Sequence, residues 1–104
     1  MTFKAIRMIA HGRVQGVGFR FFVRERAVPY GVKGWVKNLP DGTVEIHAEG
    51  EEEQLQVFIS EVEDGPSFGR VSEIDSEWVE PKYIYPKLSD FCTCKKHPNG
   101  LSCC

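Results

Sequence analysis

The sequence predicts an α/β protein, more narrowly an α+β sandwich in which a mostly antiparallel sheet carries two helices on one face. Apolar residues recur with a period of two in several segments and with a helical period in two others. These segments follow one another as strand, helix, strand, strand, helix, strand, which is the split βαβ or ferredoxin-like arrangement. The 104 residues suffice for one such domain, which buries about 65% of its unfolded surface.

The first third of the chain predicts a strand, a loop and a helix. Residues 3–10 alternate between apolar and polar side chains, as a half-buried strand does. Three glycines within seven residues then break the chain into a loop over 12–18, and apolar residues at helical spacing predict a helix over 19–28. Pro29 and the glycine after Tyr30 end that helix.

A hairpin is predicted next. Strands over 32–38 and 43–49 flank the turn Leu39-Pro40-Asp41-Gly42, in which proline presets one dihedral angle and glycine accepts a left-handed one. Alternation in the later strand predicts an inward set of Val44, Ile46 and Ala48 and an outward set of Thr43, Glu45, His47 and Glu49. We expect His47, like His11 after the first strand, to be structural or solvated, because neither has an evident partner.

The rest of the domain predicts a second helix and two strands. Glutamates at 51–53 favour a helix start, an apolar stripe follows, and Gly65-Pro66 ends the helix. Residues 71–79 predict a fourth strand with a bulge. A short last strand is expected near residues 88–92.

Composition and charge exclude several classes of function. The chain is 41% hydrophobic and 27% charged with a net charge of -2, which argues against disorder and against the electropositive face of a general nucleic-acid binder. No stretch has the length of a membrane-spanning helix or the apolar block of a secretory signal. We therefore expect a cytoplasmic monomer that binds neither nucleic acid nor membrane.

All four cysteines lie in the last thirteen residues, so we expect residues 1–91 to form the domain and residues 92–104 a cysteine-rich tail. The tail carries a cluster of Cys92, Cys94, His97, Cys103 and Cys104. Three interpretations are open: a zinc site, whose spacing fits no standard finger, redox or intermolecular disulfide chemistry, and an incidental terminal extension. For the activity itself we expect neither a metal nor another cofactor.

The segment from Gly12 to Arg20 carries the most chemical information. Its glycines lie between a strand and a helix, where they let successive backbone N–H groups point into one anion-binding concavity. The helix start adds unpaired donors, and Arg20 adds a planar fork of donors that suits a phosphate. Glycines that only make a turn and a solvated arginine give the same spacing, so both interpretations are open.

Asn38 ends the second predicted strand. Because a helix joins the first two strands, they are expected to run parallel, with their carboxyl ends at the same edge of the sheet. Asn38 then lies beside the glycine loop, where its amide is able to hold a water molecule next to a bound phosphate. A side-chain bond that stabilises the following turn explains the residue equally well.

Two segments resemble the two signatures of the acylphosphatase family. The first is Gly12-Arg13-Val14-Gln15-Gly16-Val17-Gly18-Phe19-Arg20, and the second runs from Gly31 to Asn38 and on through Glu45. The resemblance covers about residues 3–80 and implies a metal-free hydrolase of carboxylic–phosphoric mixed anhydrides with a ferredoxin-like fold. It implies that Arg20 binds the phosphate and that Asn38 orients the water. It also implies backbone donors to the phosphate from Gln15, Gly16, Val17, Gly18 and Phe19.

The chemistry of an acyl phosphate agrees with such a site. Carboxylate is a good leaving group, so positioning and charge stabilisation suffice without a metal or a covalent nucleophile. Neither motif contains an obvious general base, and we hypothesise that a phosphate oxygen of the substrate takes the proton of the water. A cysteine phosphatase needs an arginine after its cysteine, which is absent, as is the Gly-Lys-Ser/Thr ending of a P-loop.

Two alternatives to a free-standing enzyme are open. One is a non-catalytic module on the same fold that binds phosphorylated ligands or proteins, since domains similar to acylphosphatase occur within larger carbamoyl-transferring maturation proteins. The other is single-stranded RNA binding, because RNA-recognition domains share this strand order. Those domains carry aromatic residues on the outer strand faces, whereas the outward set of residues 43–49 is acidic, which argues against RNA.

Overall fold

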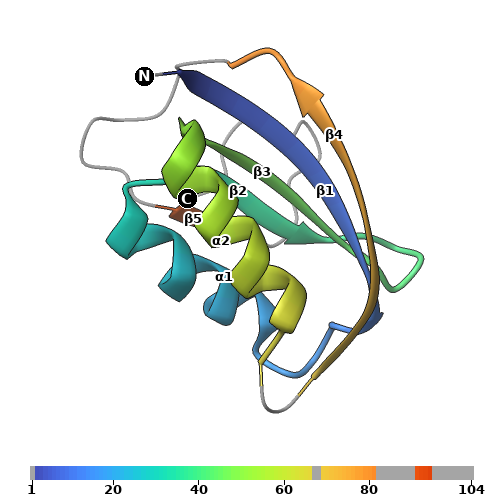
Figure 1. Cartoon of the computed structure of the whole chain (residues 1–104). Helices are drawn as coiled ribbons and strands as arrows, with labels where there is room; N and C mark the ends of the chain where they lie inside the picture. The colour runs from blue at the N-terminus through green and yellow to red at the C-terminus, as the bar shows by residue number, and fades with distance from the viewer. Residues whose placement is uncertain (1, 67–68, 82–90, 95–104) are drawn as a thin grey trace.

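Both helices lie on one face of the sheet in the computed structural model (Figure 1). The structure describes residues 2–66, 69–81 and 91–94, the last four as backbone alone. Within these ranges the elements are β1 (Phe3–Arg13), α1 (Phe19–Ala27), the 3₁₀ helix η1 (Val28–Tyr30), β2 (Lys33–Asn38), β3 (Val44–Glu51), α2 (Glu52–Asp64), β4 (Arg70–Val79) and β5 (Phe91–Cys94).

The sheet has the strand order β4-β1-β3-β2-β5. Strand β3 pairs antiparallel with both β1 and β2, so β1 and β2 run parallel to each other with β3 between them. The predicted ferredoxin-like order and the common direction of the first two strands are thereby confirmed. At the outer edge β5 pairs parallel with β2, where Phe91 lies opposite Gly34. The last strand therefore lies slightly later in the chain than the predicted 88–92.

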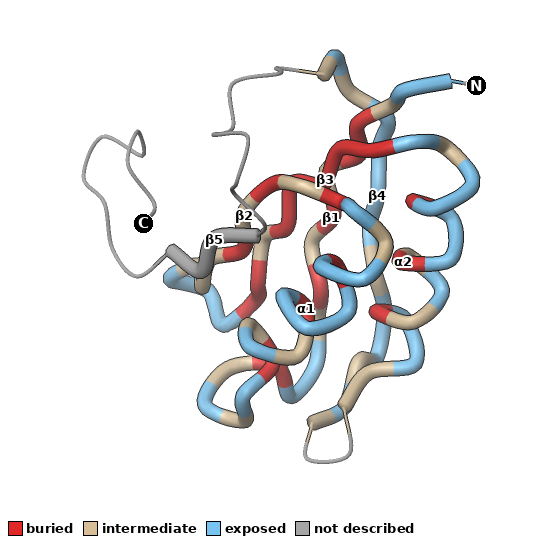
Figure 2. Tube along the Cα trace, turned by 90° about the vertical axis from the view of Figure 1, so that its left-hand side faces the viewer, coloured by how far each residue is buried: buried red, intermediate tan, exposed pale blue. Residues whose placement is uncertain are grey.

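An apolar layer between the sheet and the helices holds the fold together (Figure 2). Alternate residues of the strands and one stripe of each helix are buried there, as their periodicity predicts. Each large side chain in this layer contributes about 1.5–3 kcal/mol through burial. The largest fully buried apolar side chains are Phe19, Phe58, Met8, Ile46 and Leu55. Because the layer spans the sheet and both helices, it fixes the strand ends relative to the start of α1.

The prediction that the outward set of β3 is solvated was wrong for His47 and Glu49, which are 3% and 1% exposed. Trp35 of β2 stacks on the His47 ring with centroids 5.7 Å apart, and His47 Nε2 lies 2.7 Å from Glu49 Oε2. A strand in the middle of the sheet has neighbours on both sides, and their side chains cover its second face. His11 also has a partner, because its Nε2 lies 2.8 Å from Asp75 of β4.

Strand β1 is longer than the sequence predicted. It continues to Arg13, so Gly12 lies within the strand and not in the loop. Strand β4 approaches so closely there that a Cβ on Gly12 would lie 2.2 Å from the carbonyl oxygen of Arg70. The pairing register shifts between His11 and Gly12 and skips Ser72 of β4, which is the bulge predicted for the fourth strand.

The helices begin and end within a few residues of their predicted limits. Helix α1 gives way to η1 after Ala27, because Pro29 lies within that 3₁₀ turn. The Tyr30 hydroxyl of η1 donates to Glu61 of α2, which joins the two helical segments. Among the residues that the structure describes, no helix has the length and apolar character needed to span a membrane.

Candidate active site

A cavity of about 250 Å³ opens where the carboxyl ends of β1 and β2 meet the start of α1. Its described lining consists of Val14, Gly16, Gly18, Phe19, Arg20, Phe21, Arg24 and Asn38. The loop glycines, Arg20 and Asn38 therefore come together at one edge of the sheet. This edge is the place that the parallel direction of the first two strands predicted.

The loop after β1 owes its shape to two glycines. Gly16 and Gly18 have φ angles of 75° and 77°, in the left-handed region that other residues rarely adopt. A Cβ at either position would meet nothing within 4 Å, so the space beside the loop is open. Val14 and Phe19 are each 1% exposed and anchor the two ends of the loop in the core. A loop with left-handed residues of this kind is suited to direct backbone N–H groups toward one concavity.

The start of α1 leaves further backbone donors for a ligand. Gly18 is the N-cap residue, and no described side chain caps the helix. The Phe22 N–H donates to the Gly18 carbonyl oxygen at 3.0 Å, so the N–H groups before Phe22 have no partner within the helix. These donors and the partial positive charge of the helix end favour an anion in the cavity.

Two of the predicted phosphate-binding residues, Gln15 and Val17, are not among the described residues that line the cavity. The Gln15 side-chain Nε2 donates to the carbonyl oxygens of Leu39 and Thr43, each at 2.8 Å, and so ties the loop to the turn between β2 and β3. Val17 packs against the apolar core. The backbone N–H groups of both residues stay a prediction as phosphate donors.

The turn between β2 and β3 is held by its own residues. The backbone N–H and the hydroxyl of Thr43 both donate to Asp41 Oδ1, at 3.0 and 2.5 Å. These bonds, the hydroxyl first, hold the pKa of Asp41 below its usual value. Thr43 is buried, contrary to the prediction that it faces solvent, and it contacts Asp41 and the side chain of Gln15. The turn therefore has internal support that does not involve the side-chain oxygen of Asn38.

Asn38 carries a buried acceptor to which no described residue donates. Its Oδ1 is buried and has no hydrogen-bond partner among the described residues. An unsatisfied buried acceptor costs about 1–3 kcal/mol unless a ligand or a water donates to it. Of the two roles that the sequence left open, donation from a molecule in the cavity therefore explains Asn38 better than support of the turn.

The cavity is positively charged. Arg20 and Arg24 line it, and no acidic side chain is among its described lining residues. Sequence reasoning missed Arg24, although it follows Arg20 by four residues and so lies on the same face of α1. It also missed Phe21, which is 61% exposed at the cavity. The signal available in the sequence was an aromatic residue directly after the first-turn arginine, Arg20.

No group of three His, Cys, Asp or Glu side chains in the described part of the chain lies close enough to hold a metal ion. The five-residue cluster of the tail, from Cys92 to Cys104, lies outside the residues whose side chains are described. Its three interpretations stay open.

Comparisons with known proteins agree on one family. The acylphosphatase family model matches residues 6–92. An acylphosphatase from Geobacillus thermodenitrificans is 47% identical over 88 residues, which cover 85% of this chain and 90% of that protein. The crystal structure of acylphosphatase from Bacillus subtilis has a TM-score of 0.78 at 41% identity, over 86% of this chain and 96% of that one. Full-length HypF is similar over 90% of this chain, with a TM-score of 0.75 and 34% identity, but over 12% of its own.

Proposed function

This chain belongs to the acylphosphatase family and is a hydrolase of acyl phosphates, and we propose that Arg20 and the glycine loop bind the phosphate while Asn38 orients the attacking water. One observation carries the proposal: a single cavity joins Arg20, the loop glycines and the unsatisfied Oδ1 of Asn38. A non-catalytic binding module is not favoured, because the free-standing relatives that match along most of their length are named acylphosphatases.

The phosphoryl group binds at the start of α1 in this mechanism. The Arg20 guanidinium and the N–H groups of the phosphate-binding loop donate to the phosphoryl oxygens, whose negative charge is spread over three atoms in the transition state. The left-handed conformations of Gly16 and Gly18 support this role, because they leave room for an oxygen close to the backbone. Binding in a fixed cavity also aligns the scissile P–O bond.

Asn38 positions the nucleophile. Its Oδ1 accepts a hydrogen bond from a water molecule and so directs a lone pair of that water toward phosphorus. The water must lie opposite the carboxylate leaving group for an in-line displacement. The bond from water oxygen to phosphorus then forms as the P–O bond to the acyl carboxylate breaks.

The substrate takes part in its own proton transfer. No acidic side chain is among the described residues that line the cavity, so a phosphoryl oxygen is the nearest acceptor for the proton of the water. Transfer to that oxygen yields inorganic phosphate and the free carboxylate. The proposal therefore needs no general base from the protein.

A cytoplasmic location and a monomeric state belong to the same proposal. Every residue to which the mechanism assigns a role belongs to this chain, so the mechanism does not require a second copy. Light scattering at micromolar concentration in reductant tests the monomer, and fractionation of cells that express the tagged chain tests the location.

The test is hydrolysis of benzoyl phosphate by the wild type, Arg20→Gln and Asn38→Ala, with a chelator and a reductant present. Removing one preorganised hydrogen-bonding group from a site of this kind costs about a hundredfold to a thousandfold in kcat. We expect both variants to lose at least that much, while the chelator leaves the wild type unaffected. Near-normal turnover of Arg20→Gln would contradict the proposal.

Competitive inhibition by inorganic phosphate separates the two roles. Arg20→Gln should bind phosphate at least about tenfold more weakly, because a charged hydrogen bond to the anion is lost. Asn38→Ala should bind phosphate about as well as the wild type and fail in turnover alone. Weak phosphate binding in Asn38→Ala would assign the amide to the phosphate instead of the water.

A further inference from the structure

We propose that Arg24 and Phe21 form a second subsite, which selects acyl phosphates whose acyl group carries a negative charge of its own. The inference rests on the proposed function, because it assumes that the phosphoryl group occupies the end of the cavity at Arg20. It extends that function from the phosphate to the rest of the substrate. Neither side chain is needed for the phosphate chemistry described above.

Within the described part of the chain, no acidic side chain compensates the charge of Arg24. Arg24 lines the cavity, and within the described part of the chain its side chain forms no ion pair. Arg26, two residues later on the same helix, lies 3.4 Å from Glu61. A guanidinium beside a cavity with no described acidic lining is suited to an anionic ligand, since its donors form a rigid fork that matches a carboxylate or phosphate.

The distance between the two arginines fits one substrate with two anionic ends. Four residues separate Arg20 from Arg24, which is about 6 Å along the helix axis. Residues with this spacing lie on the same helix face. A phosphoryl group at Arg20 therefore leaves the acyl chain to run along α1, with a remote carboxylate or phosphate within reach of Arg24.

Phe21 supplies an apolar wall for the carbon skeleton between those ends. Its side chain is 61% exposed although it lines the cavity, so it takes no part in the core. The neighbouring Phe22, in contrast, packs against the core and near the Phe19 ring, with centroids 6.0 Å apart. An exposed aromatic ring that lines the same cavity as two arginines is suited to cover the carbon atoms of a ligand.

A purely structural account of Arg24 also exists. Arg24 and Arg26 both lie in the last turn of α1, where a cation favours the negative end of the helix dipole. That account predicts the same effect from replacing either arginine. The subsite predicts different effects, because Arg24 lines the cavity and Arg26 is not among its described lining residues.

The experiment compares benzoyl phosphate with 3-carboxybenzoyl phosphate. The second substrate carries one additional carboxylate in the meta position, which cannot form an internal anhydride with the acyl group. We expect the wild type to have a kcat/KM about tenfold higher for the carboxylated substrate, the usual gain from one charge-assisted contact. Arg24→Gln should abolish this preference and leave benzoyl phosphate hydrolysis within about twofold. Arg26→Gln, the matched control, should retain the preference.

Two further readouts distinguish the subsite from general charge effects. The preference should shrink as ionic strength rises, because salt screens an exposed ion pair. Phe21→Ala should lower kcat/KM for both aromatic substrates by the same factor, so that their ratio is unchanged. It should leave kcat/KM for acetyl phosphate unaffected. An unchanged ratio in Arg24→Gln, or an equal loss in Arg26→Gln, would overturn the proposal.

If the proposed function is wrong, the wild type will hydrolyse neither substrate, which distinguishes that result from failure of the subsite alone. In that case the inhibitors benzoylphosphonate and 3-carboxybenzoylphosphonate, titrated by NMR, still test the subsite. A tenfold tighter binding of the carboxylated compound that Arg24→Gln abolishes would support the subsite. Equal binding of the two compounds by the wild type would overturn it.

Discussion

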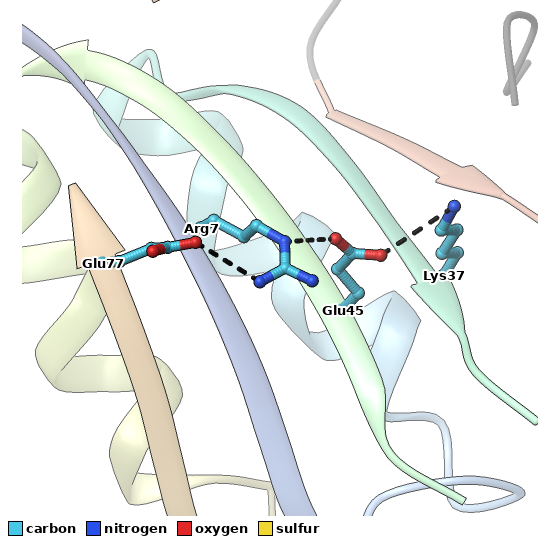
Figure 3. A network of polar contacts seen from close by, with 4 residues as sticks. All are labelled: Arg7, Lys37, Glu45 and Glu77. Atoms are coloured by element: carbon cyan, nitrogen blue, oxygen red, sulfur yellow. Dashed lines mark hydrogen bonds and ion pairs between the residues drawn. The ribbon is translucent and has the colours of Figure 1, made fainter. Parts of the chain in front are cut away.

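Arg7 on the open face of the sheet and Arg24 in the cavity are in different electrostatic environments. On the face that the helices leave open, Arg7 lies between two glutamates, with Nε 2.6 Å from Glu45 and Nη1 3.5 Å from Glu77 (Figure 3). Lys37 approaches the other oxygen of Glu45 at 3.9 Å. In the cavity, no acidic side chain is among the described lining residues, and Arg24 has no ion-pair partner in the described chain.

The difference indicates that a cation surrounded by compensating carboxylates supports the structure, whereas a cation without them is suited to bind an anionic ligand. The network around Arg7 runs across β4, β1, β3 and β2, so its charges neutralise one another and support the order of the strands (Figure 3). A partly exposed network of this kind stabilises a protein modestly. Arg24 of the cavity has no such compensation among the described residues, which leaves its charge to act on an anionic ligand.

The largest expected effect comes from the same substitution in both regions. Arg20→Gln should lower kcat/KM for acetyl phosphate about a thousandfold, which is about 4 kcal/mol of transition-state stabilisation. Arg7→Gln removes an identical charge from the paired network and should leave kcat/KM within about twofold. Steady-state kinetics measure both, and urea titrations confirm that both variants are folded. Equal losses would mean that net charge, and not local pairing, controls activity.

A smaller effect compares a glycine of the sheet, Gly12, with a glycine of the cavity loop, Gly16. Gly12→Ala places a Cβ 2.2 Å from the Arg70 carbonyl oxygen, so β4 must move, and we expect a loss of about 3 kcal/mol in the free energy of unfolding. Gly16→Ala meets no neighbour within 4 Å, and its left-handed backbone alone should cost about 1–2 kcal/mol. Urea denaturation measures both, and a cost at Gly16 as large as that at Gly12 would contradict the open loop.

Within the network around Arg7, the loss of stability on replacing a glutamate should depend on how far that glutamate is buried. The Glu45 side chain is 12% exposed and contacts two cations, whereas that of Glu77 is 62% exposed and contacts one. We expect Glu45→Gln to lower the free energy of unfolding by about 1 kcal/mol and Glu77→Gln by less than about 0.5 kcal/mol, with activity retained in both. The comparison fails if the exposed glutamate proves the more important.

The smallest effect concerns the pH dependence of the turn beside Asn38. The folded-state pKa of Asp41 lies below the ordinary 3.8, first because of the Thr43 hydroxyl and then because of its N–H. Below pH 3.8 the unfolded chain therefore takes up a proton before the folded chain does, and stability falls as pH drops toward the folded-state pKa. Thermal melts from pH 5 to pH 2 should show a shallower decline for Thr43→Val, and an unchanged slope would contradict this assignment.

The sequence predicts the cavity better than it predicts the open face. The glycine loop, Arg20 and Asn38 belong to short motifs, and the order of six local elements was enough to bring the two strand ends to one edge. The salt bridges of Arg7 join residues 38 and 70 positions apart. Periodicity carries no information about such partners, because it describes a single element at a time.

By itself, then, the sequence determined the order of the elements, the family and the motifs that contain the loop glycines, Arg20 and Asn38, since each is written in local spacing or in contiguous motifs. Only the tertiary structure decided that His47 and Glu49 are buried, that Gly12 lies against β4, that Asn38 Oδ1 has no donor among the described residues and that Arg24 lines the cavity. The physical reason is the same in each case. Burial, close approach and charge compensation are properties of a residue's neighbours in space, and those neighbours are distant in the chain.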